Sequence, residues 1–412
     1  MEPCIDATFD MFERPPVDMS VDDFNDIELL PLSSATGAHT VEFKIPSEPE
    51  HFIDLSETRL HLKLKVTLAN GKDVEANKVK LCRLFPSAIF KQVDMFLNST
   101  LVTSSSSMYP YLSYMSALLS YPTEVKKHQM QVLEYFDGAE VPKGGQLEAY
   151  TKVNLPLMNQ DRLLPNNIDV LLRFTRSRDD FVLQKTTATD TEKYAIKIEH
   201  MSLFVRKIKP SATVLLEHSR SLTRGNVVFP ITRIFSKYFT LQQGSRTFDI
   251  NNIVQGQLPS RVIIGLVSSD SFSGSYDNDC FTFAPNDLTQ INLVVNGKSI
   301  PQKPIDMDFN KGKFRRAYHN LINTLQGTCS DTQSLGLSES EYKTRSCLFA
   351  FAISKTLGSE EAIPTREEGV VSCKLTFEKD LTKNLNAVFC LEYQNNCIET
   401  DSLRNIFIDY PA

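Results

Sequence analysis

The segment FKQVDMFLNSTL, residues 90–101, contains a strand-like run that ends in a turn led by Asn98. The segment LTQINLVVNGKS, residues 288–299, repeats this pattern, and its turn residue Asn296 lies 198 positions after Asn98. Each turn is followed shortly by an amphipathic helical pattern rich in aromatic residues. A chain of 412 residues is long enough for about two or three domains. The repeat therefore predicts two similar β domains in one chain.

Most of the remaining sequence is also typical of strands separated by turn residues. Residues 58–68 place Leu60, Leu62 and Leu64 on one face and polar residues on the other, which predicts a strand with one buried face. Further strands are predicted at residues 41–45, 90–97, 168–174, 194–208, 229–240, 262–268, 291–295, 346–353, 370–377, 387–393 and 405–410. Regularly spaced strands with little helix indicate an all-β sandwich or jelly roll.

Three helices are predicted from apolar residues at helical spacing, at residues 110–119, 210–222 and 313–325. The middle one begins at Pro210, is followed by Gly225 and falls between the two halves of the repeat, so we interpret it as a connector. The predicted organisation is an acidic N-terminal arm over residues 1–36, a first β domain over 37–209, a helical connector over 210–225 and a second β domain over 226–412.

Negative charge is concentrated in the N-terminal arm. The chain has a net charge of −6, but residues 1–30 contain nine acidic residues and one basic residue, so the other 382 residues carry about +2. A charged segment of this kind is usually a solvated arm. The alternative is an arm that orders against a neighbouring subunit, with Phe9, Met11, Phe12, Phe24 and Ile27 as its apolar anchors.

The sequence lacks the common motifs of catalysis and nucleotide binding. The patterns G-x-x-x-x-G-K-[ST], G-x-G-x-x-G, G-x-S-x-G and H-E-x-x-H are all absent. The seven histidines are scattered without an H-x-H pair, which disfavours a metal-binding jelly roll. His61 lies on the polar face of its predicted strand, and we interpret it as a surface histidine. We therefore expect no enzyme activity, no cofactor and no bound metal.

Short stretches spread over nearly the whole chain carry a family resemblance. They include FDMF at residues 9–12, SLFVRK at 202–207, GQLP at 256–259, FSGSY at 272–276 and RNIFIDY at 404–410. In this order and spacing the chain resembles the double jelly-roll major capsid proteins, or hexons, of Maverick/Polinton elements and adintovirus-like viruses. The resemblance implies two tandem eight-stranded jelly rolls, with a few short helices in loops and at the connector. The N-terminal arm is more acidic than the family pattern, so no family role is carried onto it.

The resemblance further implies a structural protein whose homotrimers form pseudo-hexameric tiles of an icosahedral virus, or virus-like transposon, shell. The expected partners are other copies of the chain, a penton or minor capsid protein, and packaged DNA through non-specific contact, with no small-molecule substrate. The candidate intersubunit contacts are Phe9, Met11, Phe12, Tyr111 and Tyr318. The expected location is the virion capsid, assembled in the nucleus or cytoplasm of the host cell, since no signal peptide is visible.

Other functions stay open at this level. A carbohydrate-binding or carbohydrate-cleaving β-sandwich protein is one, but sugar sites usually recruit exposed Trp and the chain has none. A cupin-type metalloenzyme is disfavoured by the scattered histidines. A minor capsid protein is the nearest rival within a virion, and two repeats favour the hexon. The basic group Arg206, Lys207 and Lys209 is most simply a solvated strand end; the alternatives are a surface near packaged nucleic acid and an intersubunit contact with acidic arms.

Overall fold

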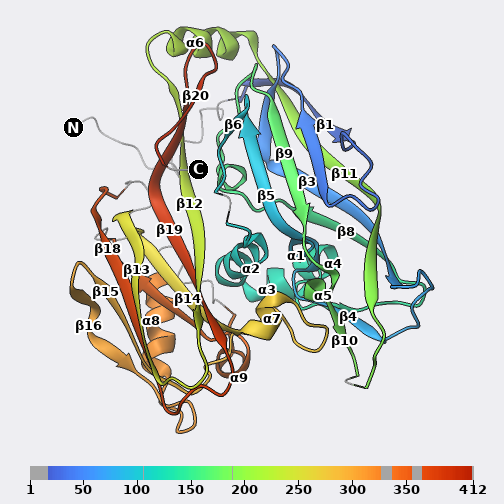
Figure 1. The fold of residues 1–412 in the computed structure, drawn as a ribbon. Helices are drawn as coiled ribbons and strands as arrows, with labels where there is room; N and C mark the ends of the chain where they lie inside the picture. Colours follow the sequence, from blue (N-terminus) through green and yellow to red (C-terminus); the bar gives the residue numbers. More distant parts are fainter. Residues whose placement is uncertain (1–16, 105, 188, 326–335, 355–363, 411–412) are drawn as a thin grey trace, which may run out of the picture.

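The computed structural model describes residues 17–104, 106–187, 189–325, 336–354 and 364–410. Figure 1 shows two β domains side by side, the first blue to green and the second yellow to red. Each domain has two antiparallel sheets that follow a path of four strands, and the short β20 adds to one sheet of the second domain. The predicted all-β fold of two tandem eight-stranded jelly rolls is therefore confirmed.

The first jelly roll packs the sheet β1-β11-β3-β8 against the sheet β2-β9-β5-β6. The bounds of these strands are Val21–Leu29 (β1), Thr40–Ile45 (β2), Phe52–Leu68 (β3), Phe90–Leu97 (β5), Thr100–Leu101 (β6), Gln146–Lys152 (β8), Val170–Arg176 (β9) and Tyr194–Pro210 (β11). A small sheet closes one end and consists of Val79–Leu81 (β4), Ala139–Glu140 (β7) and Leu183–Lys185 (β10).

The second jelly roll packs the sheet β12-β19-β14-β17 against the sheet β13-β18-β15-β16. The strands are Val227–Leu241 (β12), Thr247–Gln257 (β13), Arg261–Ser268 (β14), Leu288–Val295 (β15), Lys298–Asp306 (β16), Leu348–Ala352 (β17), Glu368–Phe377 (β18), Leu385–Thr400 (β19) and Ile406–Ile408 (β20). The strand order matches that of the first jelly roll position by position, with β12 in the place of β1 and β15 in the place of β5.

Short helices occupy the loops and the connector. They are Phe85–Ala88 (α1), Tyr109–Ser120 (α2), Thr123–Lys127 (α3), Gln129–Glu134 (α4), Asp179–Val182 (α5), Ala212–Leu222 (α6), Ser269–Ser273 (α7), Arg315–Leu325 (α8) and Glu339–Thr344 (α9), with a 3₁₀ turn at Pro156–Asn159 (η2). The three predicted helices correspond to α2, α6 and α8. In Figure 1, α6 lies at one end of the molecule and α2 lies between the jelly rolls.

The two repeated turns have the same geometry. Asn98 and Ser99 have φ angles of 44° and 71°, and Asn296 and Gly297 have φ angles of 49° and 79°. The Asn98 side-chain oxygen accepts from the Asp169 amide at 2.8 Å, and the Asn296 oxygen accepts from the Val370 amide at 2.8 Å. Each asparagine thus fastens its hairpin to the adjacent strand, β9 or β18, so the sequence repeat corresponds to a structural repeat.

Strand β1 lies inside the segment that the sequence analysis assigned to the acidic arm. Residues 21–29 pair antiparallel with β11 of the same chain, and Asp26 forms an ion pair with Arg206 at 2.9 Å. Without β1 the first jelly roll would have seven strands rather than eight. The first sheet therefore begins within the arm, and Arg206 binds the acidic segment of its own chain. Phe9, Met11 and Phe12 lie outside the described residues.

The core runs through both jelly rolls. Leu60, Leu62 and Leu64 are buried, as the alternation predicted, and β3 extends further back to Phe52. Cys347, Cys373 and Cys390 are buried free thiols that pack as small apolar side chains.

Candidate functional site

An aromatic cluster joins the two jelly rolls at α2 of the first, the helix that lies between them in Figure 1. The Tyr111 ring stacks on Phe272 of α7 with a centroid distance of 5.3 Å, and the Tyr114 ring stacks on Phe281 at 4.5 Å. Phe283 also contacts both tyrosine rings, with centroids 6.4 and 6.3 Å away. Aromatic pairs add about 0.5–1.5 kcal/mol each beyond their area burial. The junction between the domains is therefore packed like a domain core.

A buried ion pair crosses the same junction. Arg83, next to α1, contacts Asp279 of the second jelly roll at 2.6 Å, and its side chain is 8 % exposed. The guanidinium also donates to the Tyr114 hydroxyl at 2.7 Å. Burying a guanidinium is favourable only when its charge and its N–H groups are paired. The guanidinium is paired in this way with one group from each jelly roll, Tyr114 of the first and Asp279 of the second.

Further contacts extend the junction in both directions from α2. The Tyr276 hydroxyl donates to the Tyr194 carbonyl at 2.7 Å, and the Lys185 amide donates to the Tyr276 carbonyl at 2.7 Å. Near the C-terminus, the Tyr410 hydroxyl donates to the Val102 carbonyl at 2.9 Å. Because these contacts are spread along the junction, the two jelly rolls pack as one unit rather than as two loosely linked domains.

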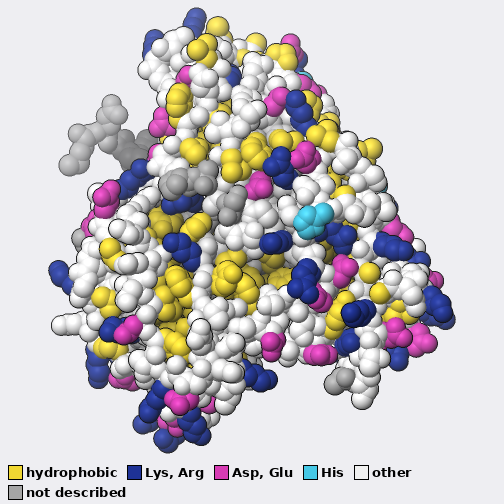
Figure 2. Space-filling model, viewed as in Figure 1, with side chains coloured by type: hydrophobic (Ala, Val, Ile, Leu, Met, Phe, Trp, Pro, Cys, Tyr) yellow, Lys and Arg dark blue, Asp and Glu magenta, His cyan; other side chains and the backbone are white. Residues whose placement is uncertain are grey.

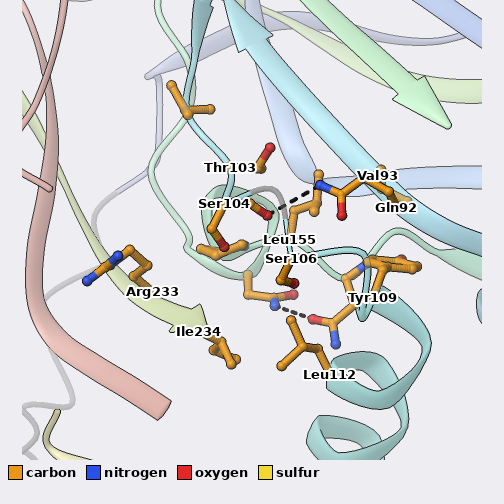
Figure 3. Close-up of a pocket in the computed structure, with 14 residues that line it drawn as sticks. Gln92, Val93, Thr103, Ser104, Ser106, Tyr109, Leu112, Leu155, Arg233 and Ile234 are labelled. Carbon is orange, nitrogen blue, oxygen red and sulfur yellow. Dashed lines mark hydrogen bonds between the residues drawn. The ribbon is translucent and has the colours of Figure 1, made fainter. Parts of the chain in front are cut away.

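One of the spaces along the junction, next to α2, is small. This cavity has a volume of about 40 Å³, and Figure 3 shows its lining, which includes Gln92 and Tyr109 from the first jelly roll and Arg233 and Ile234 of β12. The Gln92 amide donates to the Ser104 carbonyl at 3.3 Å across this cavity. A water occupies at least about 10–15 Å³ of such volume, so the cavity has room for a few waters and not for a substrate.

The structure assigns different environments to the predicted contact residues. Tyr111 is 3 % exposed and contacts the second jelly roll of its own chain, which is an intramolecular contact in place of the expected intersubunit one. Tyr318 of α8 is half-buried, and its hydroxyl donates to the Leu337 carbonyl at 2.8 Å. The described residues therefore leave Tyr318 as a candidate contact, and its role stays a prediction.

Apolar side chains are exposed at the end of the molecule that carries α6. The helix buries none of its residues, and Leu216 on it is 52 % exposed. Leu403, just before β20, is 80 % exposed, and Phe407, within β20, is 50 % exposed. Figure 1 places β20 at the same end. We call Leu216, Leu403 and Phe407 the α6-end surface. Figure 2 shows that hydrophobic side chains also gather along the middle of the molecule, between the jelly rolls.

A cluster of ligand-type side chains lies on the outer face of the sheet β1-β11-β3-β8. Glu28, His61 and His200 come from β1, β3 and β11, and their ligand atoms all lie within 4.8 Å of one another. His61 is not freely solvated, because its side chain is 16 % exposed and its Nε2 lies 2.7 Å from Glu148 Oε1. This cluster is not visible in the sequence, because its members are far apart along the chain and meet only through the strand register.

In the part of the chain that the structure describes, no helix has both the length and the apolar character needed to cross a membrane.

No protein-family model matches the chain. An uncharacterized protein of Caenorhabditis elegans is 24 % identical over 397 residues, covering 89 % of this chain and 93 % of the relative. The chain is similar in structure to one from the Sputnik virophage, with a TM-score of 0.67, 11 % identity and coverage of 99 % and 93 % of the two chains. For the PBCV-1 virus capsid these values are 0.62, 10 %, 97 % and 100 %, and for the mavirus major capsid protein 0.51, 9 %, 99 % and 96 %.

The likeness covers nearly all of each solved chain, so it includes both jelly rolls and their junction. The protein therefore has the double jelly-roll fold of these capsid chains. At the level of the fold, the resemblance to double jelly-roll major capsid proteins is confirmed.

Proposed function

We propose that this chain is a structural, non-enzymatic major capsid protein that assembles with itself into a virion shell. The observation that supports this most is the likeness over full length to a PBCV-1 capsid chain and the mavirus major capsid protein. The closely packed junction between the jelly rolls fits this role, because a subunit of a shell must keep its two halves in a fixed arrangement while neighbouring subunits bind to each of them.

The assembly unit in this proposal is a homotrimer. Three chains with two jelly rolls each place six similar units in a closed ring, which gives a pseudo-hexameric tile of an icosahedral shell. The structural repeat supports this arrangement, because both halves have the same strand order and the same asparagine-fastened turn. An obligate interface of this kind buries more than about 2,000 Å².

The ring geometry also suggests where chains meet. Within one chain, α2 follows β6 and packs against the second jelly roll; α8 follows β16 in the second half and is its counterpart. We therefore assign α8, with Tyr318, to the contact between neighbouring chains. Phe9, Met11 and Phe12 of the arm and the α6-end surface are assigned to contacts between or beneath tiles.

The cavities support a structural role over carbohydrate hydrolysis, which usually needs two carboxyl groups across the substrate. A cavity of about 470 Å³ below α6 is lined by Phe52, Leu215 and Phe229 among others, and none of its described lining residues is acidic. A second cavity of about 450 Å³ contains Asp179 and Asp180. Both acids are already engaged: Asp179 pairs with Arg176 at 3.2 Å and Asp180 pairs with Arg178.

The remaining partners belong to the same proposal. A shell of hexon-like tiles needs a penton or minor capsid protein at its vertices, and its inner surface meets packaged DNA non-specifically. Assembly takes place inside the host cell, in the nucleus or cytoplasm. The genome of origin is a Maverick/Polinton element or an adintovirus-like virus, as the sequence resemblance suggests.

Mass and shape of the purified full chain test the trimer. Light scattering after size-exclusion chromatography is expected to give three times 46.6 kDa, about 140 kDa, and negative-stain images are expected to show pseudo-hexagonal particles. Arg315→Glu on the exposed side of α8 should raise the monomer fraction, while Lys72→Glu in an exposed loop should not. A stable monomer of wild-type protein at the concentrations used for imaging would contradict the proposal.

A further inference from the structure

The cluster of Glu28, His61 and His200 occupies three adjacent strands. In the pairing of β11 with β3, Ser202 lies opposite His61 and Lys63 opposite His200, so the two histidines are diagonal neighbours on the same face. On the other side of β11, Glu28 of β1 lies opposite Phe204 and reaches back to His200, with 3.6 Å between its Oε1 and His200 Nε2. Three chain segments thus converge on one point.

The surroundings of the cluster hold the two imidazole rings in place. The His61 ring lies 5.9 Å from the His200 ring and 6.1 Å from Phe204, both measured between centroids. Glu148 of β8 contacts His61 Nε2 at 2.7 Å and is 67 % exposed, so it can move without disturbing the sheet. Lys63 lies 3.9 Å from Glu148 and is half-exposed, and it can extend into solvent.

Two imidazoles and a carboxylate are a ligand set that borderline metal ions prefer. Zn²⁺ takes nitrogen and oxygen ligands at about 2.0–2.2 Å in a tetrahedral site, which places ligand atoms roughly 3.4 Å apart. The three ligand atoms lie within 4.8 Å of one another. Small rotations of these partly exposed side chains close this difference.

We propose that Glu28, His61 and His200 bind one divalent transition-metal ion per chain, Zn²⁺ foremost. The proposal does not depend on the capsid role, because it rests on the geometry of one sheet.

The consequence of the site concerns strand β1. None of its residues is buried, and its outer edge is unpaired within the described chain. Ile27 and Leu29 pack against the core, and its other side chains make surface contacts, such as the Asp26–Arg206 ion pair and the packing of Arg206 over the Phe24 ring at 5.6 Å. Surface ion pairs contribute little. A metal ion that takes one ligand from β1 and two from β11 and β3 fastens the start of the chain to the first jelly roll.

The binding test uses the full chain freed of metal with a chelator and then titrated with ZnCl₂ in a calorimeter. One site per chain is expected, and His61→Ala and His200→Ala should each weaken it at least tenfold. His128→Ala is the matched control, because the exposed His128 contacts Glu124 at 3.2 Å and belongs to no such cluster among the described residues. Equal affinity of all four proteins, or no binding by wild type, would overturn the proposal.

Three further readouts identify the ligand atoms, test the effect on β1 and exclude misfolding of the variants. The Co²⁺-loaded protein should show visible bands of nitrogen and oxygen ligation, and a thiolate charge-transfer band would instead assign the ion to a cysteine. Zn²⁺ should slow hydrogen exchange of residues 21–29 in wild type but not in Glu28→Gln. Zinc binding without protection of β1 would refute the fastening of the strand, and matching melting temperatures of the metal-free variants will show that each is folded.

Discussion

The two repeated turns, at Asn98–Ser99 and Asn296–Gly297, differ at their second residue, so they allow the effect of that one residue on the free energy of unfolding to be measured. Ser99 and Gly297 occupy equivalent places with φ angles of 71° and 79°, a region that disfavours side chains other than glycine. Both residues are exposed, and a Cβ at Gly297 would have no atom within 4 Å, so packing does not enter. A non-glycine residue in this conformation costs about 1 kcal/mol.

We therefore expect opposite effects from exchanging the two residues. Ser99→Gly should raise the free energy of unfolding by about 1 kcal/mol, and Gly297→Ser should lower it by a similar amount. Chemical denaturation of both variants beside wild type measures this. Changes of the same sign would show that the two turns are not equivalent.

Asp169 links the turn of Asn98 to the pH dependence of stability. A hydrogen bond from Lys44, at 2.9 Å, and one from the Ser47 amide, at 2.9 Å, lower the pKa of Asp169 from 3.8 to about 2. A lowered folded-state pKa gives stability that is present above the unfolded value and is lost as the pH falls towards 2. The side chain is 40 % exposed, so solvent limits the contribution to about 1 kcal/mol or less.

The test compares wild type with Asp169→Asn across pH. Wild type should be the more stable protein at neutral pH, and the difference should disappear between about pH 4 and pH 2. Thermal unfolding at a series of pH values measures it. A difference that persists unchanged at pH 2 would show that the carboxylate charge is not its source.

At the scale of elements, helix α2 packs between the jelly rolls, and Arg83 donates a hydrogen bond to Tyr114 of this helix. Arg83→Ala would leave Asp279 partly buried without its cation and the Tyr114 hydroxyl without its donor, and removing one partner of a buried pair costs about 3 kcal/mol. Urea denaturation should show this loss. Arg220→Ala breaks an exposed ion pair with Glu217 and should change stability by less than about 0.5 kcal/mol. Similar losses of stability in both variants would contradict a special contribution of the buried Arg83 contacts at α2.

The sequence predicted all the central strands of the four jelly-roll sheets and also the edge strands β2, β12 and β17. The central strand β3 was predicted because Leu60, Leu62 and Leu64 alternate and are buried. The missed strands of seven or more residues are β1, β8, β13 and β16, and each lies at the edge of its sheet. An edge strand carries more exposed polar residues and tolerates proline, as Pro301 and Pro304 in β16 illustrate. For β1, β8 and β13, membership in the sheet is decided by pairing with a strand distant in sequence, which local periodicity does not encode.

The same limit applies to the candidate sites. The sequence located Tyr111 on an amphipathic helix, but the partner of that helix depended on how the two jelly rolls pack. The cluster of Glu28, His61 and His200 was invisible because its members come from three strands. The repeat, in contrast, was detectable, because each turn is encoded by adjacent residues.

At the scale of the whole molecule, the N-terminal segment divides into two parts with different expected roles. Residues 21–29 complete the first jelly roll, whereas Phe9, Met11 and Phe12 lie outside the described residues and are our candidates for contacts between tiles. Removal of residues 1–20 should therefore leave a trimer, lighter than the full-length one only by the deleted residues, and abolish its assembly into shells.

Removal of residues 1–30 provides the matched comparison, because it also removes β1. That variant lacks β1, one of the eight strands of the first jelly roll, and so exposes the edge of β11. It should melt at a lower temperature than wild type, whereas the shorter deletion should melt at the wild-type temperature. Light scattering, electron microscopy and thermal unfolding of both deletions separate assembly from folding. Shells of normal size from the shorter deletion would refute the tile-contact role of the arm, and an unchanged melting temperature in the longer one would show that β1 adds nothing to the stability of the sheet.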